Sequence, residues 1–486
     1  MSPFTATIIY ATLIAGMFYL DRDSKARTSP ALWIVVIWMW LACSRVASQW
    51  LAVFGWTGDV WPRETPDQYL NGSPLDRNVL SVLVALGIFV LYQRRRKVLA
   101  ILAANMPTLL FFSYCALSIC WSDYPEVAIK RWVKALGNVV MVLVVLTDPD
   151  QLSAIRRILS RVGFIMIPVS ILFIKYYPEI GRGYNPSSWE MYFAGVTDNK
   201  NGLGTICLIL GVGSVWRIVQ LLKDDNVNRV RHLIAHVTLV LMALWLLLKA
   251  DSMTSMACIV MASGLMFATT LRTVARRPAI IHALTLSIIL GSLYALLLDT
   301  GGGMVATLGR NPTLTGRTEL WQQVIALSGN PLVGTGFESF WLGSRIEKLW
   351  SMYWWHPNES HNGYLEIYLT LGWIGVSLMA GIMVIGYRNA VVAFRRNSEF
   401  GRLMLAFFVA STVYNLTEAG FRGTDPIWFV FIWACMVIPA LRETGNPSPQ
   451  DLVLYPPPRD RGLISQTVCF GTAKISSREK RENLRK

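Results

Sequence analysis

The sequence predicts an all-α, polytopic integral membrane protein. Of its 486 residues, 53% are hydrophobic and only 15% are charged, whereas a soluble protein carries about 25% charged residues. The mean hydropathy of +0.42 argues against a disordered chain and against a soluble globular enzyme. The third observation is a series of apolar segments, many of which approach the roughly 20 residues that a helix needs to cross the hydrocarbon core.

These apolar segments predict about 12 to 14 transmembrane helices. They are 4–20, 31–54, 79–93, 98–120, 131–147, 160–175, 201–222, 232–250, 254–272, 278–299, 363–388, 402–417 and 425–441. The first has no basic stretch before it and no small-residue cleavage site after it, so we expect a retained helix rather than a signal peptide. Residues 1–441 are therefore the predicted transmembrane domain. Residues 442–486, with three consecutive prolines and scattered charges, are a predicted flexible cytoplasmic tail.

The loops between the segments alternate in charge. Every second loop is basic, as is the tail, and the positive-inside rule predicts that this set is cytoplasmic. Its clusters are Arg22, Lys25 and Arg27; Arg94 to Lys97; Arg156, Arg157 and Arg161; Lys223, Arg229 and Arg231; Arg272, Arg276 and Arg277; and Arg388, Arg395, Arg396 and Arg402. The remaining loops, chief among them 300–362, should face outward. Topology thus explains most of the net charge of +15, and we expect membrane lipids rather than nucleic acid as partners.

The predicted outward loops carry no motif for a metal or a nucleotide. They lack the DxD pair of metal-dependent sugar transfer, the sequence lacks the GxxxxGK[ST] phosphate loop, and none of its seven cysteines forms a CxxC pair. His356, Glu359 and His361 do not have HExxH spacing, and Pro357 prevents the helical geometry that this motif needs. We therefore expect no cofactor, no metal and a donor substrate that arrives already activated.

The outward loop 300–362 is too long to be a simple connection and should carry function. At its end, His361 lies at the mouth of an apolar segment, where a side chain with a pKa of about 6.5 can act as a neutral base. The alternative is an interfacial histidine that only caps a helix. Glu366 is five residues further on, off the i+3/i+4 spacing, so a structural or acceptor-orienting role is expected for it. The loop aromatics suit an interfacial belt or, alternatively, a sugar-stacking surface: Trp341, Trp350, Tyr353, Trp354 and Trp355.

Cations at the mouths of several outward segments are candidate anion ligands. Arg317 could grip two phosphate oxygens with parallel hydrogen bonds, or pair with Glu319 or a lipid head group instead. Arg182, Lys200 and Arg422 lie on the same predicted side. Each alone suits a lipid-facing residue, but together they would attract a diphosphate.

At these motifs the sequence resembles the O-antigen ligase and Wzy-type polymerase superfamily, most closely its ExoQ-type exopolysaccharide polymerases. The resemblance rests on Ser360-His361-Asn362-Gly363-Tyr364-Leu365-Glu366 with Leu371 to Gly375, and on Thr315-Gly316-Arg317-Thr318-Glu319-Leu320-Trp321 with Pro331 to Phe337. Weaker matches include Asn199 to Gly204 and Asn415 to Glu418. Together these motifs cover roughly residues 110–425.

The resemblance implies a GT-C-like glycosyltransferase of the bacterial inner membrane, acting on the periplasmic side, metal-independent and inverting. The implied donor is a glycan on undecaprenyl diphosphate, the acceptor is a hydroxyl of a glycan or lipid-linked unit, and a flippase and a chain-length regulator are expected partners. His361 and Arg317 are the expected catalytic residues. The expected substrate-binding residues are Arg182, Lys200, Asn201, Glu366, Glu418 and Arg422.

Three alternatives remain at this stage. One is a structural or regulatory membrane subunit, which would not need His361 and the arginines on a single face. An O-antigen ligase would transfer the glycan to lipid A–core instead of extending it, although the Thr315 to Trp321 motif favours a polymerase. A transporter or flippase for the same lipid-linked glycan would place charges near the bilayer midplane and show internal symmetry. The candidate residues instead cluster at one edge and no repeat is apparent, which favours an enzyme.

Overall fold

The computed structural model describes residues 1–437 except 24–26, 57–71, 186–188, 224–227 and 298–313. These residues belong to one compact unit, Met1–Pro439. The predicted tail, 442–486, and the first part of the predicted outward loop, 300–313, lie outside the described residues. The expectation of a flexible cytoplasmic tail therefore stays a prediction.

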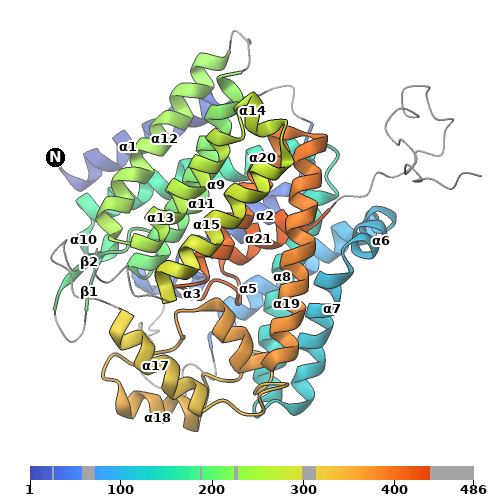
Figure 1. The fold of residues 1–486 in the computed structure, drawn as a ribbon. Helices are drawn as coiled ribbons and strands as arrows, with labels where there is room; N and C mark the ends of the chain where they lie inside the picture. The colour runs from blue at the N-terminus through green and yellow to red at the C-terminus, as the bar shows by residue number, and fades with distance from the viewer. Residues whose placement is uncertain (24–26, 57–71, 186–188, 224–227, 298–313, 438–486) are drawn as a thin grey trace, which may run out of the picture. The chain divides into compact units, whose positions relative to one another are not determined.

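The described unit is built almost wholly from helices (Figure 1), which confirms the predicted fold class. Its single sheet is an antiparallel pair of three-residue strands, β1 and β2, in which Gly183 lies opposite Tyr192. The elements are α1 (Pro3–Leu20), α2 (Leu32–Ala42), α3 (Ala47–Val53), α5 (Pro74–Gln93), α6 (Arg95–Ala104), α7 (Met106–Leu117), η1 (Ser118–Trp121), α8 (Pro125–Leu146), α9 (Gln151–Tyr176), α10 (Pro178–Gly181), β1 (Arg182–Tyr184), β2 (Met191–Phe193), α11 (Lys200–Leu221), α12 (Arg229–Ala250), α13 (Met253–Ala268), α14 (Arg272–Ala275), α15 (Pro278–Leu297), α17 (Leu314–Ala326), α18 (Ser344–Met352), α19 (Gly363–Arg396), α20 (Ser398–Tyr414) and α21 (Pro426–Cys435).

Fewer helices than expected are long and apolar enough to cross a membrane. Seven of the described helices meet that requirement, or up to nine if each of two bent helix pairs is one span. The expected 12 to 14 spans included segments that prove short, such as α20 with 17 residues and α13 with 16. α8 is long enough, but its first half carries Glu126, Lys130, Arg131 and Lys134. The chain is nevertheless a multi-pass membrane protein, with α9 and α11 in its interior and α1 and α15 at its periphery.

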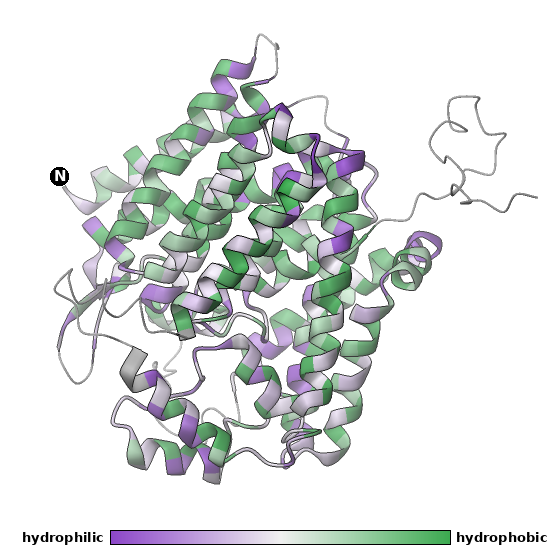
Figure 2. Ribbon diagram, in the orientation of Figure 1, coloured by the Kyte–Doolittle hydropathy of each residue, from purple (hydrophilic) through white to green (hydrophobic). Residues whose placement is uncertain are grey.

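Charged residues gather at the two ends of the bundle, as the hydropathy colouring of Figure 2 shows. At one end, basic loops that are distant in sequence contact one another. Arg94 donates to Ser29 Oγ at 2.7 Å, Arg231 donates to the Arg22 carbonyl at 2.7 Å, and Arg156 pairs with Glu399 at 3.7 Å. We call this the basic end. The other end, which carries His361 and the short helices α17 and α18, is called the site end.

α19 joins the two ends and is broken at Gly372, whose φ of +63° and ψ of −165° are not helical. The break lets another segment enter. The N–H groups of Trp373 and Ile374 donate to the carbonyls of Pro331 and Leu332 at 2.9 and 3.1 Å. A Cβ on Gly372 would lie 2.3 Å from the Leu332 carbonyl. This explains why the Leu371 to Gly375 motif requires glycine: the backbone of the loop packs directly on the helix.

Gly372→Ala should therefore destabilise the protein by about 1–3 kcal/mol or more, because it combines a strained φ with a backbone clash. The measurement is the thermal stability of the purified protein in detergent, followed by monodisperse recovery on size exclusion. Gly381→Ala in the same helix is the matched control, since an added Cβ there meets no atom within 4 Å. Equal stability of the two variants would contradict the role given to Gly372.

Candidate active site

His361 is fixed in place by the way α19 begins. The Asn362 side chain accepts hydrogen bonds from the N–H groups of Tyr364 and Leu365 at 3.0 Å, which is a helix N-cap. Gly363 donates to the carbonyls of Asn415 and Glu418 at 2.9 and 3.0 Å, and a Cβ here would lie 2.0 Å from Asn415 Oδ1. His361 itself has a φ of +52°. A left-handed backbone is unusual for a non-glycine residue and is often found at functional sites.

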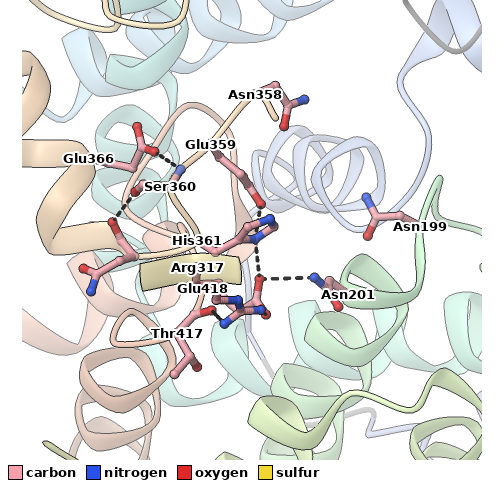
Figure 3. Close-up of polar contacts among 12 residues, drawn as sticks. Asn199, Asn201, Arg317, Asn358, Glu359, Ser360, His361, Glu366, Thr417 and Glu418 are labelled. Atoms are coloured by element: carbon pink, nitrogen blue, oxygen red, sulfur yellow. Dashed lines mark hydrogen bonds and ion pairs between the residues drawn. The ribbon is translucent and has the colours of Figure 1, made fainter. Parts of the chain in front are cut away.

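The imidazole of His361 lies between two carboxylates (Figure 3). Its Nδ1 atom is 3.0 Å from Glu359 Oε1 and 3.4 Å from Glu418 Oε2. Among the described residues, Nε2 of this histidine has no hydrogen-bond partner. The ring therefore turns one nitrogen to the carboxylates and keeps the other available for a substrate.

Glu418 connects three further parts of the chain to His361. Its Oε1 atom is 3.4 Å from the Arg317 guanidinium of α17, and its Oε2 atom accepts from Asn201 of α11 at 3.2 Å. Arg317 also donates to the carbonyl of Thr417 at 2.7 Å. The carboxylate is only 7% exposed, so these contacts form in a partly desolvated place, where charges interact more strongly than in water.

A second arginine supports the other carboxylate. The Arg422 guanidinium is 3.3 Å from Glu359 Oε2 and donates to the carbonyl of Asn358 at 3.3 Å. The cluster thus holds two carboxylates, two guanidiniums and one imidazole. We call Glu359, His361, Glu418, Arg317 and Arg422 the charge cluster.

These contacts change the pKa of both members of the central pair. Burial acts to lower the pKa of His361, but its hydrogen bonds to Glu359 and Glu418 and their charges outweigh burial and raise the pKa to about 9. Burial acts to raise the pKa of Glu359, but the hydrogen bond to His361, with the charges of His361, Arg422 and Arg317, holds it well below its usual range. His361 is therefore mostly protonated at pH 7, in contrast to the neutral base expected from its ordinary pKa.

Glu366 positions the loop that carries His361. Its Oε1 atom accepts from the Ser360 N–H at 2.5 Å, and its Oε2 atom accepts from Trp341 Nε1 at 2.9 Å. Trp321 in turn donates to the Ser360 carbonyl at 2.7 Å. With both oxygens engaged and 6% of the residue exposed, Glu366 matches the structural role expected from its spacing better than a direct contact with substrate.

The loop aromatics separate into different environments. Trp341 is buried on Glu366, and Trp350 stacks on His356 with ring centroids 4.5 Å apart. Trp354 is 65% exposed. Trp355 is 37% exposed and lies beside the His361 ring at 6.3 Å, with the two planes 29° apart. Only Trp355, among the five loop aromatics, offers open ring surface next to the charge cluster.

Two of the expected cations are not brought to the cluster. Arg182, in β1, donates to the Ile174 carbonyl at 2.9 Å and lies over the Phe193 ring at 5.9 Å. Lys200, in the first turn of α11, is exposed and has no hydrogen bond or ion pair with a described residue of the cluster. Asn201, next to it, does reach Glu418. Sequence reasoning assigned Glu359 only to a rejected zinc motif and so missed its contact with His361, two residues away.

The charge cluster includes three residues of the types that bind metal ions: Glu359, His361 and Glu418. Their ligand atoms all lie within 4.8 Å of one another, and an imidazole with two carboxylates is a donor set that divalent metals accept. The trio was not visible in the sequence because Glu418 is 57 residues from His361. Arg317 and Arg422 each contact one of the two carboxylates, and their positive charges oppose a divalent cation there.

Comparisons with known proteins agree with this picture. The family described as O-Antigen ligase matches residues 237–380, which include His361 and Arg317 but not Glu418 or Arg422. A curated relative, the exopolysaccharide production protein ExoQ of Rhizobium meliloti (strain 1021), is 28% identical over 332 residues, covering 66% of this chain and 73% of its own length. The match to the O-Antigen ligase domain and the likeness to ExoQ together support the assignment of this chain to the O-antigen ligase and ExoQ-type family of membrane proteins.

Proposed function

We propose that this protein is a glycosyltransferase that moves a glycan from undecaprenyl diphosphate onto a hydroxyl acceptor, in exopolysaccharide or O-antigen polymerisation. The observation that carries the proposal is the placement of His361 between Glu359 and Glu418, with Arg317 and Arg422 on those carboxylates. A base beside two fixed cations is what an inverting transfer from a lipid diphosphate requires. The active site would face the periplasm of the bacterial inner membrane, the side opposite the basic end.

His361 is the proposed general base. The acceptor hydroxyl attacks the anomeric carbon, its proton passes to Nε2, and the bond to the diphosphate oxygen breaks with its electron pair leaving on the diphosphate. Glu359 and Glu418 stabilise the imidazolium that forms, as the acid does in a serine-hydrolase triad. Such a base contributes roughly 10²–10⁴-fold to the rate.

Arg317 and Arg422 are the proposed ligands of the diphosphate. Charge develops on the leaving oxygen, and fixed guanidiniums stabilise it in a site that is partly closed to water. Arg317 is 22% exposed at its side chain and Arg422 is 36% exposed, so both can meet a ligand without rearrangement of the backbone. Trp355 offers an aromatic face on which an acceptor sugar can stack while its hydroxyl reaches His361. Arg182 and Lys200, outside the cluster, would act only on a longer donor.

A ligase that transfers the glycan to lipid A–core would use the same chemistry. The likeness to ExoQ favours a polymerase, because that relative is described as an exopolysaccharide production protein. A flippase activity of this chain itself is disfavoured, because the charge cluster lies at one end of the helices rather than midway along them. A separate flippase and a chain-length regulator, which the sequence led us to expect as partners, remain proposed partners.

His361→Ala should lower polymer formation by roughly 10²–10⁴-fold, because the acceptor hydroxyl loses its base. The assay measures product from purified lipid-linked donor and acceptor with detergent-solubilised enzyme. His282→Ala is the matched control, since His282 of α15 hydrogen-bonds to Tyr387 of α19 at 2.6 Å, away from the cluster. Normal product from a folded His361→Ala protein would remove His361 from the base role.

The pH profile tests the base assignment against a purely cationic role for the imidazole. Because the pKa of His361 is about 9, the rate should rise with pH until this proton is lost. Because the pKa of His361 is raised from about 6.5, its interaction with Glu359 and Glu418 stabilises the folded protein fully below pH ~6.5. This contribution to the free energy of unfolding is lost as pH rises through about 9. Glu359→Gln should move the rising limb to lower pH. Glu347→Gln, at an exposed position of α18, should leave it in place. A rate that falls as pH rises towards 9 would assign His361 a cationic role.

Two hypotheses for the charge cluster make opposite predictions: stabilisation of the diphosphate by arginine, and stabilisation by a bound metal ion. If Arg317 stabilises the diphosphate, Arg317→Ala should lower the rate about 10²–10³-fold. Arg317→Lys should recover little, because one ammonium cannot contact Thr417 and Glu418 as the guanidinium does. Arg345→Ala, which breaks a pair with Asp123 at the site end, is the control. Activity should survive dialysis against a chelator. Loss that is reversed by a divalent metal would instead support the Glu359, His361 and Glu418 trio as a metal site.

A further inference from the structure

A row of cations lines a cavity at the basic end, at the opposite end of the bundle from His361. Four consecutive residues, Arg94 to Lys97, line it with Thr147 and Pro149, and its volume is about 560 Å³. Arg94 is anchored by neutral groups, since it donates to Ser29 Oγ at 2.7 Å and to Thr147 Oγ1 at 3.2 Å. Arg95, Arg96 and Lys97 are exposed.

The residues that line this cavity carry a net positive charge. Among the described residues no carboxylate lines it. Asp148 and Asp150 flank the lining residue Pro149, but Asp148 is 2% exposed and accepts from the N–H of Ser29 at 3.2 Å, and Asp150 accepts from the N–H of Ser153 at 3.0 Å. The four cations outnumber these two acids, and an anion in the cavity relieves the repulsion among them.

The same residues begin α6, which turns sharply away from the bundle. α6 makes an angle of 91° with the helix from Met106 to Trp121, and Figure 1 shows it projecting from the side of the unit. Asn105 fixes the bend: it is 3% exposed, its Nδ2 donates to the Val437 carbonyl at 2.8 Å, and its Oδ1 accepts from the Val437 N–H at 2.8 Å. Pro107 in the first turn of α7 prevents a continuous helix.

We take Met106–Trp121 as the part of this bent helix pair that crosses the membrane. A helix at right angles to it then lies along the membrane surface. α6 has the composition for that position, because its first turn is basic and the rest is apolar. Ile101 is its only buried residue. Leu99 is 65% exposed, and its neighbours Tyr92 and Met106 are 66% and 45% exposed. Among the described elements, α6 packs mainly against its chain neighbours α5 and α7, so this apolar surface is left exposed.

We propose that this cavity binds the head group of an anionic phospholipid, with α6 lying in the membrane interface beside it. The phosphate sits among Arg95, Arg96 and Lys97, while the acyl chains follow the apolar side of α6. The proposal is independent of the reaction at the site end. Topology alone would account for basic residues in this loop, but it would require neither the cavity nor the fixed bend.

Native mass spectrometry of the full-length protein in neutral detergent tests this proposal. The probes are phosphatidylglycerol and phosphatidylcholine with identical acyl chains. We expect retained adducts with phosphatidylglycerol and not with phosphatidylcholine. Replacing Arg95, Arg96 and Lys97 together by Gln should weaken phosphatidylglycerol binding on the order of tenfold to a hundredfold, since each basic residue near the surface contributes to attraction of anionic lipid.

A matched control separates this site from general charge. Replacing Arg272, Arg276 and Arg277 together by Gln removes three exposed cations from another basic loop that does not line the cavity, and it should leave binding unchanged. Equal weakening by both triple variants, or equal binding of the two lipids, would overturn the proposal. Complete displacement of the lipid by inorganic pyrophosphate at matched concentration would also overturn it, by showing a site for a free phosphate.

Discussion

The Glu418 carboxylate is the contact on which the candidate active site depends. It joins the His361 loop, Arg317 of α17 and Asn201 of α11 in a place where its side chain is 7% exposed. Gly363 donates to the Glu418 carbonyl as well, so side chain and backbone of one residue fix the start of α19. A buried acid of this kind is stable only while its cations stay in place, because an unpaired charge there is strongly unfavourable. The same pairing therefore holds the helices together and sets the chemistry.

That pairing also determines what His361 can do. Two carboxylates raise the pKa of its imidazole to about 9, which makes the neutral form a stronger base but a rarer one at pH 7. Arg317 and Arg422 limit this effect by neutralising the same carboxylates. A diphosphate that drew either arginine away would expose more negative charge to His361. In the proposed mechanism, donor binding and the protonation state of His361 would therefore be coupled through Glu359 and Glu418.

The sequence anticipated part of this site. His361, Arg317, Asn201, Glu418 and Arg422 were all expected to act together, and the structure brings them within reach of one another. The expectation for Arg182 and Lys200 rested only on their shared predicted side of the membrane, which does not fix distance within a face. Fewer described helices than expected are long and apolar enough to span, because α13, α20 and α21 have only 16, 17 and 10 residues and α8 carries charges in its first half. Hydropathy summed over a window registers neither feature.

The sequence by itself determined the fold class and the grouping of the basic loops, because these follow from composition and charge. It also singled out the His361 and Arg317 motifs, through their resemblance to a family. Only the tertiary structure decided which carboxylate contacts His361, which aromatic lies beside it and where α19 breaks. Glu418 and His361 are 57 residues apart, and the entry of Leu332 at Gly372 joins two distant segments. Such contacts depend on the packing of whole helices, which no local pattern contains.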